Sequence, residues 1–252
     1  MLFGIRTYVT NTPERIPNLQ LWLDAQRIAQ ANDTEVATWT DASGNGYNAE
    51  QNTTAARPIY KTNQLNGLPV VRFDGVDDFM ELVSGSLDMA RNVAGLTIVA
   101  VVKYPADSSE NIAFSIANDS TVSRSILLQD ALNKYRAGGR RLDANPFESA
   151  ISTQNATAAF IIQTGVLDYT NATLNQYING VVDGTDDPFQ TAGSTSNTAS
   201  SRIRVGANSV VTAGSLLTGD IAEIIVYQRV LTANELTNVH AYLAAKWGIT
   251  LA

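Results

Sequence analysis

The feature that most constrains this sequence is a strand that leads directly into a capped helix, between Gly219 and Gly248. The run from Ile221 to Tyr227 is apolar, rich in β-branched residues and interrupted only by Glu223. Such a run is typical of a strand that is covered on both faces. We therefore expect the strand to lie inside the fold, with Glu223 as a structural acid.

A helix is predicted after Arg229, where the apolar residues take up helical spacing. Thr232 and Glu235 fit a capping box, in which the hydroxyl and the carboxylate each satisfy a backbone N–H that is free at the helix start. Gly248 provides the stop. The apolar stripe contains Leu236, Val239, Leu243 and Trp247. Since the core needs this strand and this helix to be complete, we expect one closed unit.

The composition favours one large all-β domain. The chain has 252 residues, of which only 16% are charged, and no long helical pattern occurs before Thr232. All-β sandwiches of this length are common as single domains. Short strands joined by polar turns are therefore expected, and a core of this size needs neither a disulfide nor a metal for its stability.

The charge and the residue counts exclude several classes of function. A net charge of −7 argues against nucleic acid binding, which depends on clustered basic residues, and the group Arg136, Arg140 and Arg141 is too small to change this. The absence of cysteine excludes disulfides, thiol chemistry and thiolate metal sites. Residues 1–18 contain no apolar stretch of signal-peptide length, so we expect no classical export signal. No run approaches a membrane span, so no membrane partner is expected.

Strand and turn signals recur along the chain. Leu19 to Asp24 alternates apolar and polar residues, and Leu96 to Lys103 is an apolar strand that we place in the middle of a sheet. Asn66-Gly67 and Asn179-Gly180 are hairpin signals, because this dipeptide accepts positive φ angles. Between Asn133 and Asn155 the pattern is broken by glycines and proline, so we expect long loops at one rim there.

Eight motifs, in their order along the chain, resemble the laminin-G-like, concanavalin A-like jelly-roll proteins of bacteria and their phages. They are LWLDA, WTDASGNGYNA, LNGLPVVRFDGVDDFMEL, LTIVAVVK, YINGVVDG, RIRVGA, GDIAEIIVYQRVLTANE and YLAAKWGI. The resemblance implies an all-β fold of two antiparallel sheets packed face to face, with one C-terminal α-helix against the sandwich. It also implies that the concave sheet and its rim loops form the usual binding surface. We assign residues 1–17 to an N-terminal extension or docking arm, and residues 18–252 to a single jelly-roll domain.

The turn that begins at Asp41 is the first candidate metal site. Asp41, Ser43 and Asn45 place oxygen side chains at the first, third and fifth positions of a segment with glycine at the sixth, which is how a calcium loop begins. The twelfth position is Asn52 instead of the bidentate glutamate. A tight Asx-type turn is therefore an equal alternative for Asp41 and Asn45.

The second candidate is the acidic corner formed by Asp74, Asp77 and Asp78. Three carboxylates so close together repel one another unless a cation, an arginine or water separates them. Arg72 is near enough in sequence to be that partner. Calcium is the cation that this corner or the Asp41 turn would take, although the fold itself requires no cofactor.

Catalysis is not expected. Glycosidases that share this fold carry carboxylates two residues apart on one strand, which place acid and nucleophile in the same cleft. Glu223 is the one acid inside a strong strand, and Asp220, three residues before it, is predicted to point to the opposite face. His240 lies on the helix without an evident serine or aspartate partner, and we interpret it as a surface or half-buried residue.

The residues also support sugar binding. A lectin needs exposed aromatic rings to stack on sugars and polar side chains to bond their hydroxyls. Residues of these types in or near the irregular segment are Tyr135, Arg136, Arg140, Arg141, Phe147 and Tyr169. Trp22, Trp39 and Trp247 follow strand or helix patterns and are assigned to the core.

These observations lead to one hypothesis and one alternative. The first is a non-enzymatic protein of a virion surface, such as a capsid decoration or a tail component, made in the host cytoplasm and attaching to glycans. Its partners would be other capsid or tail proteins and glycans, and self-association into a homo-oligomer is compatible with it. The alternative is a carbohydrate-binding or adhesion module on the bacterial surface or outside the cell, without a virion.

Overall fold

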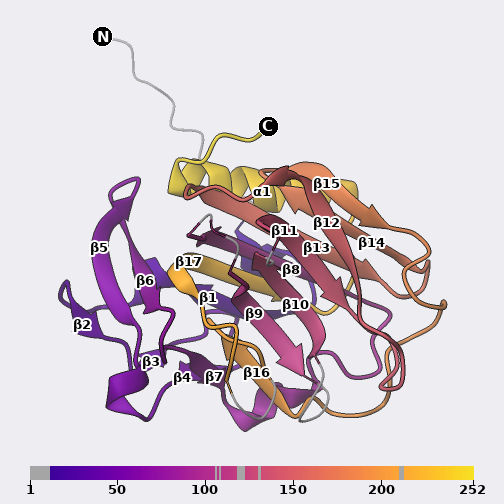
Figure 1. The fold of residues 1–252 in the computed structure, drawn as a ribbon, viewed down its shortest axis with the longest axis horizontal. Helices are drawn as coiled ribbons and strands as arrows, with labels where there is room; N and C mark the ends of the chain where they lie inside the picture. Colours follow the sequence, from indigo (N-terminus) through magenta and orange to yellow (C-terminus); the bar gives the residue numbers. More distant parts are fainter. Residues whose placement is uncertain (1–11, 106, 108, 118–122, 130–131, 210–212) are drawn as a thin grey trace.

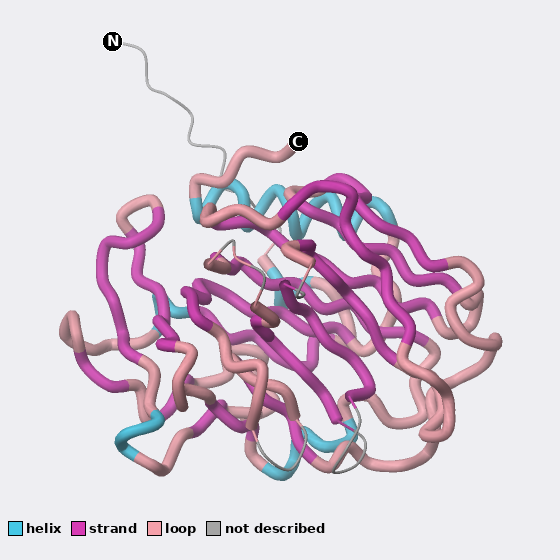
Figure 2. The backbone as a smooth tube through the Cα atoms, viewed as in Figure 1, coloured by secondary structure: helices cyan, strands magenta, loops and turns pink. Residues whose placement is uncertain are grey.

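The fold is a sandwich of two antiparallel sheets with a helix on one outer face (Figures 1 and 2). It is seen in a computed structural model that describes residues 12–105, 107, 109–117, 123–129, 132–209 and 213–252. Within these residues, no helix has the length and apolar character that crossing a bilayer requires. The all-β jelly-roll class predicted from the sequence is confirmed.

The first sheet carries the central strand of the molecule, β17. Its order is β15-β14-β13-β8-β17-β6-β5-β2, and β1 also pairs with β17. The bounds are β1 Leu19–Asp24, β2 Thr34–Glu35, β5 Ile59–Leu65, β6 Leu68–Asp74, β8 Gly95–Lys103, β13 Phe160–Asp168, β14 Thr173–Ile178, β15 Val181–Asp186 and β17 Thr218–Tyr227. β8 lies between β13 and β17, so its predicted place in the middle of a sheet is confirmed.

The second sheet and the helices complete the architecture. The order of the second sheet is β12-β11-β10-β9-β16-β7-β4-β3. Its bounds are β3 Thr38–Trp39, β4 Ala49–Glu50, β7 Met80–Leu82, β9 Asn111–Ala117, β10 Ser123–Gln129, β11 Lys134–Gly139, β12 Glu148–Asn155 and β16 Arg202–Val205. The helices are α1 Ala233–Trp247 and the short 3₁₀ turns η1 Pro13–Arg15, η2 Ala25–Arg27, η3 Thr54–Ala56 and η4 Ser84–Asp88.

The hydrophobic interior has two parts. The larger part fills the space between the two sheets and includes Trp39, Phe73 and Phe114. The smaller part lies between the first sheet and α1, where the predicted apolar stripe of the helix is buried against side chains of β8 and β17. Since β17 faces both parts, its continuous apolar pattern is explained, and the predicted burial of all three tryptophans is confirmed.

The predicted local signals form as expected. Thr232 and Glu235 make a complete capping box at the start of α1, and Gly248 ends the helix with φ 67°. Asn66 and Asn179 have φ angles of 50° and 49°, each followed by a glycine with positive φ. Both hairpins are therefore set by turns that asparagine and glycine adopt at little cost.

The prediction of long loops between Asn133 and Asn155 is wrong. This segment contains strands β11 and β12, which pair with each other and leave only residues 140–147 between them. Gly138 lies within β11, where its missing side chain leaves space for the ring of Phe147. A Cβ there would lie 2.6 Å from the Phe147 ring and 2.8 Å from the carbonyl oxygen of Glu148.

Glu223 fastens α1 to the first sheet. Its Oε1 accepts hydrogen bonds from Trp22 Nε1 (2.6 Å) and the Tyr242 hydroxyl (3.0 Å). Its Oε2 accepts from Lys246 Nζ (2.8 Å) and Trp247 Nε1 (2.7 Å). The carboxylate therefore joins β1 on one side to three residues of the helix on the other.

The side chain of Glu223 has no exposed surface, so its charge depends on these partners. Burial raises the pKa of the Glu223 carboxyl, and the Lys246 ammonium opposes that shift. All four partners donate, so the arrangement is satisfied by the ionised carboxylate, which only accepts. Glu223 is thus a structural acid.

We predict that Glu223→Ala lowers the free energy of unfolding by about 3–5 kcal/mol, because it leaves two buried indole N–H groups without their acceptor and removes one of the two carboxylates that bind Lys246. Urea denaturation followed by tryptophan fluorescence measures this change. The control is Glu35→Gln, which removes an exposed ion pair to Arg57 (3.7 Å) and should cost less than about 1 kcal/mol. Equal losses in the two variants would contradict the role assigned to Glu223.

Candidate functional site

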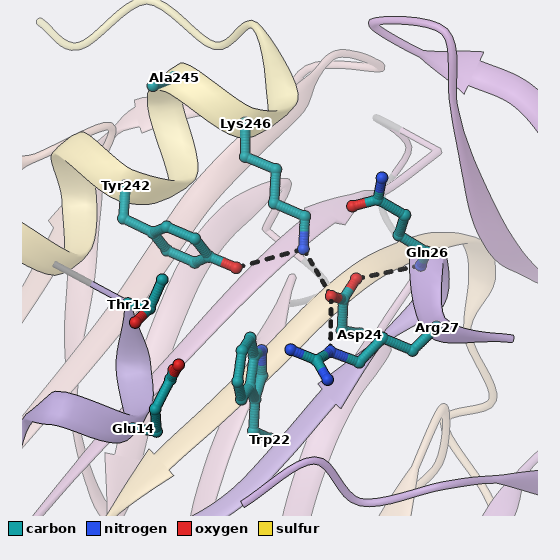
Figure 3. Close-up of a pocket in the computed structure, with 9 residues that line it drawn as sticks. All are labelled: Thr12, Glu14, Trp22, Asp24, Gln26, Arg27, Tyr242, Ala245 and Lys246. Atoms are coloured by element: carbon teal, nitrogen blue, oxygen red, sulfur yellow. Dashed lines mark hydrogen bonds and ion pairs between the residues drawn. The ribbon is translucent and has the colours of Figure 1, made fainter. Parts of the chain in front are cut away.

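A cavity of about 590 Å³ opens where the outer face of the first sheet meets α1. Figure 3 shows Trp22 in its middle, Thr12 and Glu14 on one side, and Asp24, Gln26 and Arg27 on the other. Helix α1 contributes Tyr242, Ala245 and Lys246. The lining thus combines two aromatic residues with carboxylate, amide, hydroxyl and cationic side chains, which is the composition of a polar ligand pocket.

The floor of the cavity is an ion cluster. Asp24 lies directly opposite Glu223 in the β1–β17 pairing, where two carboxylates would repel each other. Lys246 Nζ lies between them, 2.7 Å from Asp24 Oδ2 and 2.8 Å from Glu223 Oε2. Asp24 Oδ1 also accepts the backbone N–H of Gln26 (3.0 Å) and so caps η2. The floor is therefore fixed in place and its acids are already paired.

The wall beside Trp22 is covered by Arg27. The guanidinium carbon lies 4.3 Å from the centre of the Trp22 ring, and Arg27 Nε is 3.4 Å from Asp24 Oδ2. Trp22 keeps only 3% of its surface exposed, whereas the Arg27 side chain keeps 54%. Arg27 is thus held on the indole face while its outer N–H groups are directed to solvent and to the cavity.

The prediction that Asp220 and Glu223 point to opposite faces is wrong. A bulge between Ile221 and Glu223 shifts the register, so that Asp220 pairs with Lys103 and Glu223 with Val101. Those two partners are two residues apart on β8, which places both acids on the same face. The bulge is invisible to a strict two-residue period.

This shared face does not create a glycosidase pair. Asp220 is held by Arg72, with Nε 2.6 Å and Nη2 3.0 Å from its two carboxylate oxygens. Glu223 is completely buried under α1. A glycosidase needs two carboxyl groups that both reach the scissile bond, one as an acid and one as a nucleophile or base. The geometry of Asp220 and Glu223 does not meet that requirement.

The six sugar-site residues predicted from the sequence do not line this cavity. Tyr135 and Tyr169 are 1% and 0% exposed, so neither ring is available to stack on a ligand. Arg140 is buried, and Arg136 and Arg141 are partly buried. Arg141 donates to Thr191 Oγ1 (2.7 Å), which ties it to a neighbouring loop. Phe147 is 36% exposed, and its ring packs on Gly138.

The sequence analysis missed the cavity residues because they come from two distant segments, residues 12–27 and 242–246. One signal could have found part of them. Lys246 interrupts the apolar side of a helix, and Asp24 ends an apolar strand, so each charge needs a buried partner. Nothing in the spacing indicates that the two charges meet.

The Asp41 turn is built as an Asx-type turn. Asp41 Oδ1 accepts the N–H groups of Trp22 (3.0 Å) and Ser43 (2.9 Å). Its Oδ2 accepts the Ser43 hydroxyl (2.7 Å) and the N–H of Tyr47 (3.0 Å). Asn45 turns its amide nitrogen to the carbonyl of Leu19 (3.0 Å). Both carboxylate oxygens therefore have protein donors, as the turn alternative expects.

The acidic corner does gather its carboxylates. One oxygen from each of Asp74, Asp77 and Asp78 lies within 4.8 Å of the others, which is the kind of cluster that a hard cation such as calcium takes. Arg72 is not its partner, as expected from sequence proximity, because the β6–β17 pairing sets Arg72 opposite Asp220. Asp74 and Asp78 also line a second cavity of about 510 Å³. Calcium binding at this corner stays a prediction.

His240 lies on the buried side of α1, with 3% exposure, and is not the surface or half-buried residue that we expected. Its Nε2 lies 2.9 Å from Thr164 Oγ1, and its ring lies beside Tyr177. Burial lowers the pKa of His240 to about 4, so the imidazole is neutral at pH 7. The helix stripe brings His240 into the core along with Val239, which explains the difference.

The two antiparallel sheets packed face to face define a jelly roll of the concanavalin A-like class. The sequence matches the concanavalin A-like lectin/glucanases superfamily, laminin G type, over residues 74–237, which is more than half of the chain. The chain belongs to this family. No curated protein gives a significant match.

Several solved structures share the fold at low sequence identity. Domain 4 of AbnA, an extracellular arabinanase from Geobacillus stearothermophilus in complex with arabinotriose, is 15% identical with TM-score 0.60, covering 88% of this chain and 98% of that domain. The binding domain of Paraclostridial Mosquitocidal Protein 1 is 13% identical with TM-score 0.62, covering 92% of this chain and 53% of that one. Botulinum neurotoxin type C, whose cell entry depends on two ganglioside molecules, is 13% identical with TM-score 0.59. The match covers 90% of this chain and 51% of that one. These similarities concern the fold.

The acidic corner predicts a pH effect on stability. Burial, together with the charges of Asp74 and Asp77, raises the pKa of Asp78 to about 7 from 3.8. The folded protein therefore holds a proton that the unfolded chain has lost, and the stability that this group contributes is lost as the pH rises through about 7. Asp78→Asn keeps an acceptor for the Asp74 N–H but has no carboxyl group to titrate. The urea midpoint of this variant, relative to that of wild type, should therefore rise between pH 5 and pH 8. The control Asp107→Asn alters an exposed carboxylate, and a parallel change in both variants would contradict the effect.

Proposed function

We propose that this protein is a non-catalytic glycan-binding jelly roll and that the cavity between β1, η2 and α1 is its site. The observation that carries the proposal is the lining of that cavity, which places the partly exposed Tyr242 beside carboxylate, amide, hydroxyl and cationic side chains on a lectin-type fold. Its volume of about 590 Å³ is within the range of small-molecule binding pockets. The arabinotriose complex of a structurally similar domain supports the class of ligand.

The absence of catalysis is part of the proposal. Asp24 and Glu223 both bind Lys246, and Glu223 lies below the cavity surface, out of reach of a bound sugar. Moving either acid into a catalytic position would break the contacts that hold α1 to the sheet. We therefore assign these acids to the scaffold of the site, whose function is recognition.

A second part of the proposal concerns where the protein acts. We place it on the surface of a virion, as a decoration or tail component that presents the cavity to glycans. The support is the order of sequence motifs, which resembles jelly-roll proteins of phages as well as of bacteria. The alternative is a module on a bacterial surface, which would use the same cavity.

Ala245→Trp should weaken glycan binding strongly. Ala245 is an exposed helix residue on the cavity wall, so an indole there fills the cavity without entering the core. A glycan array, followed by calorimetry with the best ligand, should show binding by wild type and a loss of at least about tenfold in the variant. Phe147→Ala, at the rim predicted from sequence, is the matched control and should bind as wild type does. If Phe147→Ala loses binding and Ala245→Trp keeps it, the glycan site lies at that rim and not in the cavity.

Immunogold labelling with an antibody against this chain tests the virion placement. The expected result is label on the outer surface of intact particles in cultures of the producing bacterium. Label confined to bacterial cells or to the medium would overturn the virion role and favour the bacterial module. The glycan experiment is independent of this result.

A further inference from the structure

The cavity has free hydrogen-bonding groups on two opposite walls. The side chains of Thr12, Glu14 and Gln26 make no hydrogen bond or ion pair with the described residues. Arg27 uses its Nε on Asp24, and its two terminal amino groups make no such contact within the same residues. In Figure 3, Thr12 and Glu14 lie across the cavity from Gln26 and Arg27. A ligand can therefore bind both walls at once.

The two walls differ in hydrogen-bond chemistry. An ionised carboxylate such as that of Glu14 only accepts hydrogen bonds, whereas a guanidinium such as that of Arg27 only donates them. The guanidinium of Arg27 lies over the Trp22 ring and its Nε is bound to Asp24, which restricts the side chain and leaves its terminal N–H groups available to a ligand as a fork. The ligand must offer donors to Glu14 on one edge and acceptors to Arg27 on the opposite edge.

The charge of the cavity limits the ligand further. Its lining holds two carboxylates, Glu14 and Asp24, and two cations, Arg27 and Lys246. Glu223 lies directly below and adds a third carboxylate. Lys246 is shared by the two floor acids, so no unshared positive charge remains there to attract an anion. The cavity therefore has no net positive field for an acidic ligand.

We propose that the cavity selects neutral sugars over acidic ones, with Glu14 as the residue that rejects the acidic ones. This proposal rests on the proposed glycan-binding function and names its ligand class. A sugar hydroxyl donates and accepts, so one ring can donate to Glu14 from one diol and accept from Arg27 and Gln26 at another. A uronic acid or another carboxylated sugar meets the charge of Glu14. Its carboxylate finds neutral donors on Gln26 and Thr12, but the one lining cation not held between the two floor acids is Arg27.

The test uses the full chain and an array of neutral oligosaccharides paired with their uronic acid counterparts, which differ only in a carboxylate at C6. Wild type should bind the neutral member of a pair at least about tenfold more tightly than the uronate. Glu14→Gln keeps the size of the side chain and removes its charge, and it should reduce this preference to within about twofold. The exposed Glu35→Gln is the matched control and should keep the wild-type ratio.

The outcomes separate the two proposals. If wild type binds no glycan, or if Ala245→Trp binds as wild type does, the proposed site fails. If binding depends on Ala245 but uronates bind as well as neutral sugars, only the selectivity proposal is overturned. If Glu14→Gln keeps the wild-type preference for neutral sugars, then Glu14 is not the residue that rejects acidic sugars. Because Glu14 is exposed, equal thermal unfolding midpoints for wild type and Glu14→Gln are expected and confirm that the comparison concerns binding.

Discussion

The structure depends on one buried carboxylate that connects elements far apart in the chain. Glu223 accepts hydrogen bonds from Trp22 in β1 and from Tyr242, Lys246 and Trp247 in α1. A buried charge with so many donors contributes specificity of position, because shifting the helix by one turn would separate its three donors from Glu223. The apolar stripe of α1 explains why the helix packs on the first sheet. The hydrogen bonds to Glu223 explain why the helix takes this position along the sheet.

The same contacts create the candidate site. Lys246 bridges Asp24 and Glu223, and this arrangement holds β1 and α1 at the spacing that leaves the cavity between them. Asp24 in turn caps η2, which carries Arg27 onto the face of Trp22. The rigid part of the site is thus scaffold, and the side chains with free hydrogen-bonding capacity lie on its walls. Recognition residues supported from below by a fixed polar network are common in binding sites that are formed before the ligand arrives.

Much of the fold could be predicted from local patterns, and much of the site could not. Strand alternation, the two Asn-Gly turns and the capping box at Thr232 are local, so the sandwich and its helix were accessible from sequence. Strands β11 and β12 were missed because Gly138 is required by the ring of Phe147, a contact that the sequence does not show. The face of Asp220 was misjudged because one bulged residue reverses the alternation. The cavity was missed because its charges meet only through β-pairing and helix packing. Its own lining residues therefore carry no recognisable spacing.

The position of β17 also has a consequence for how the chain reaches this fold. β17 lies between β8 and β6 and also pairs with β1, so three strands made earlier depend on it. The contact between Trp22 and Glu223 spans 201 residues. While the chain is being synthesised, β6 and β8 each have an unpaired edge until residues 218–227 emerge. The hydrogen bonds from α1 to Glu223 can form only after residue 247 has been made. Non-local pairing of this kind slows folding and leaves strand edges open to association. The first sheet is therefore completed late, in a single closing step that joins both ends of the described chain.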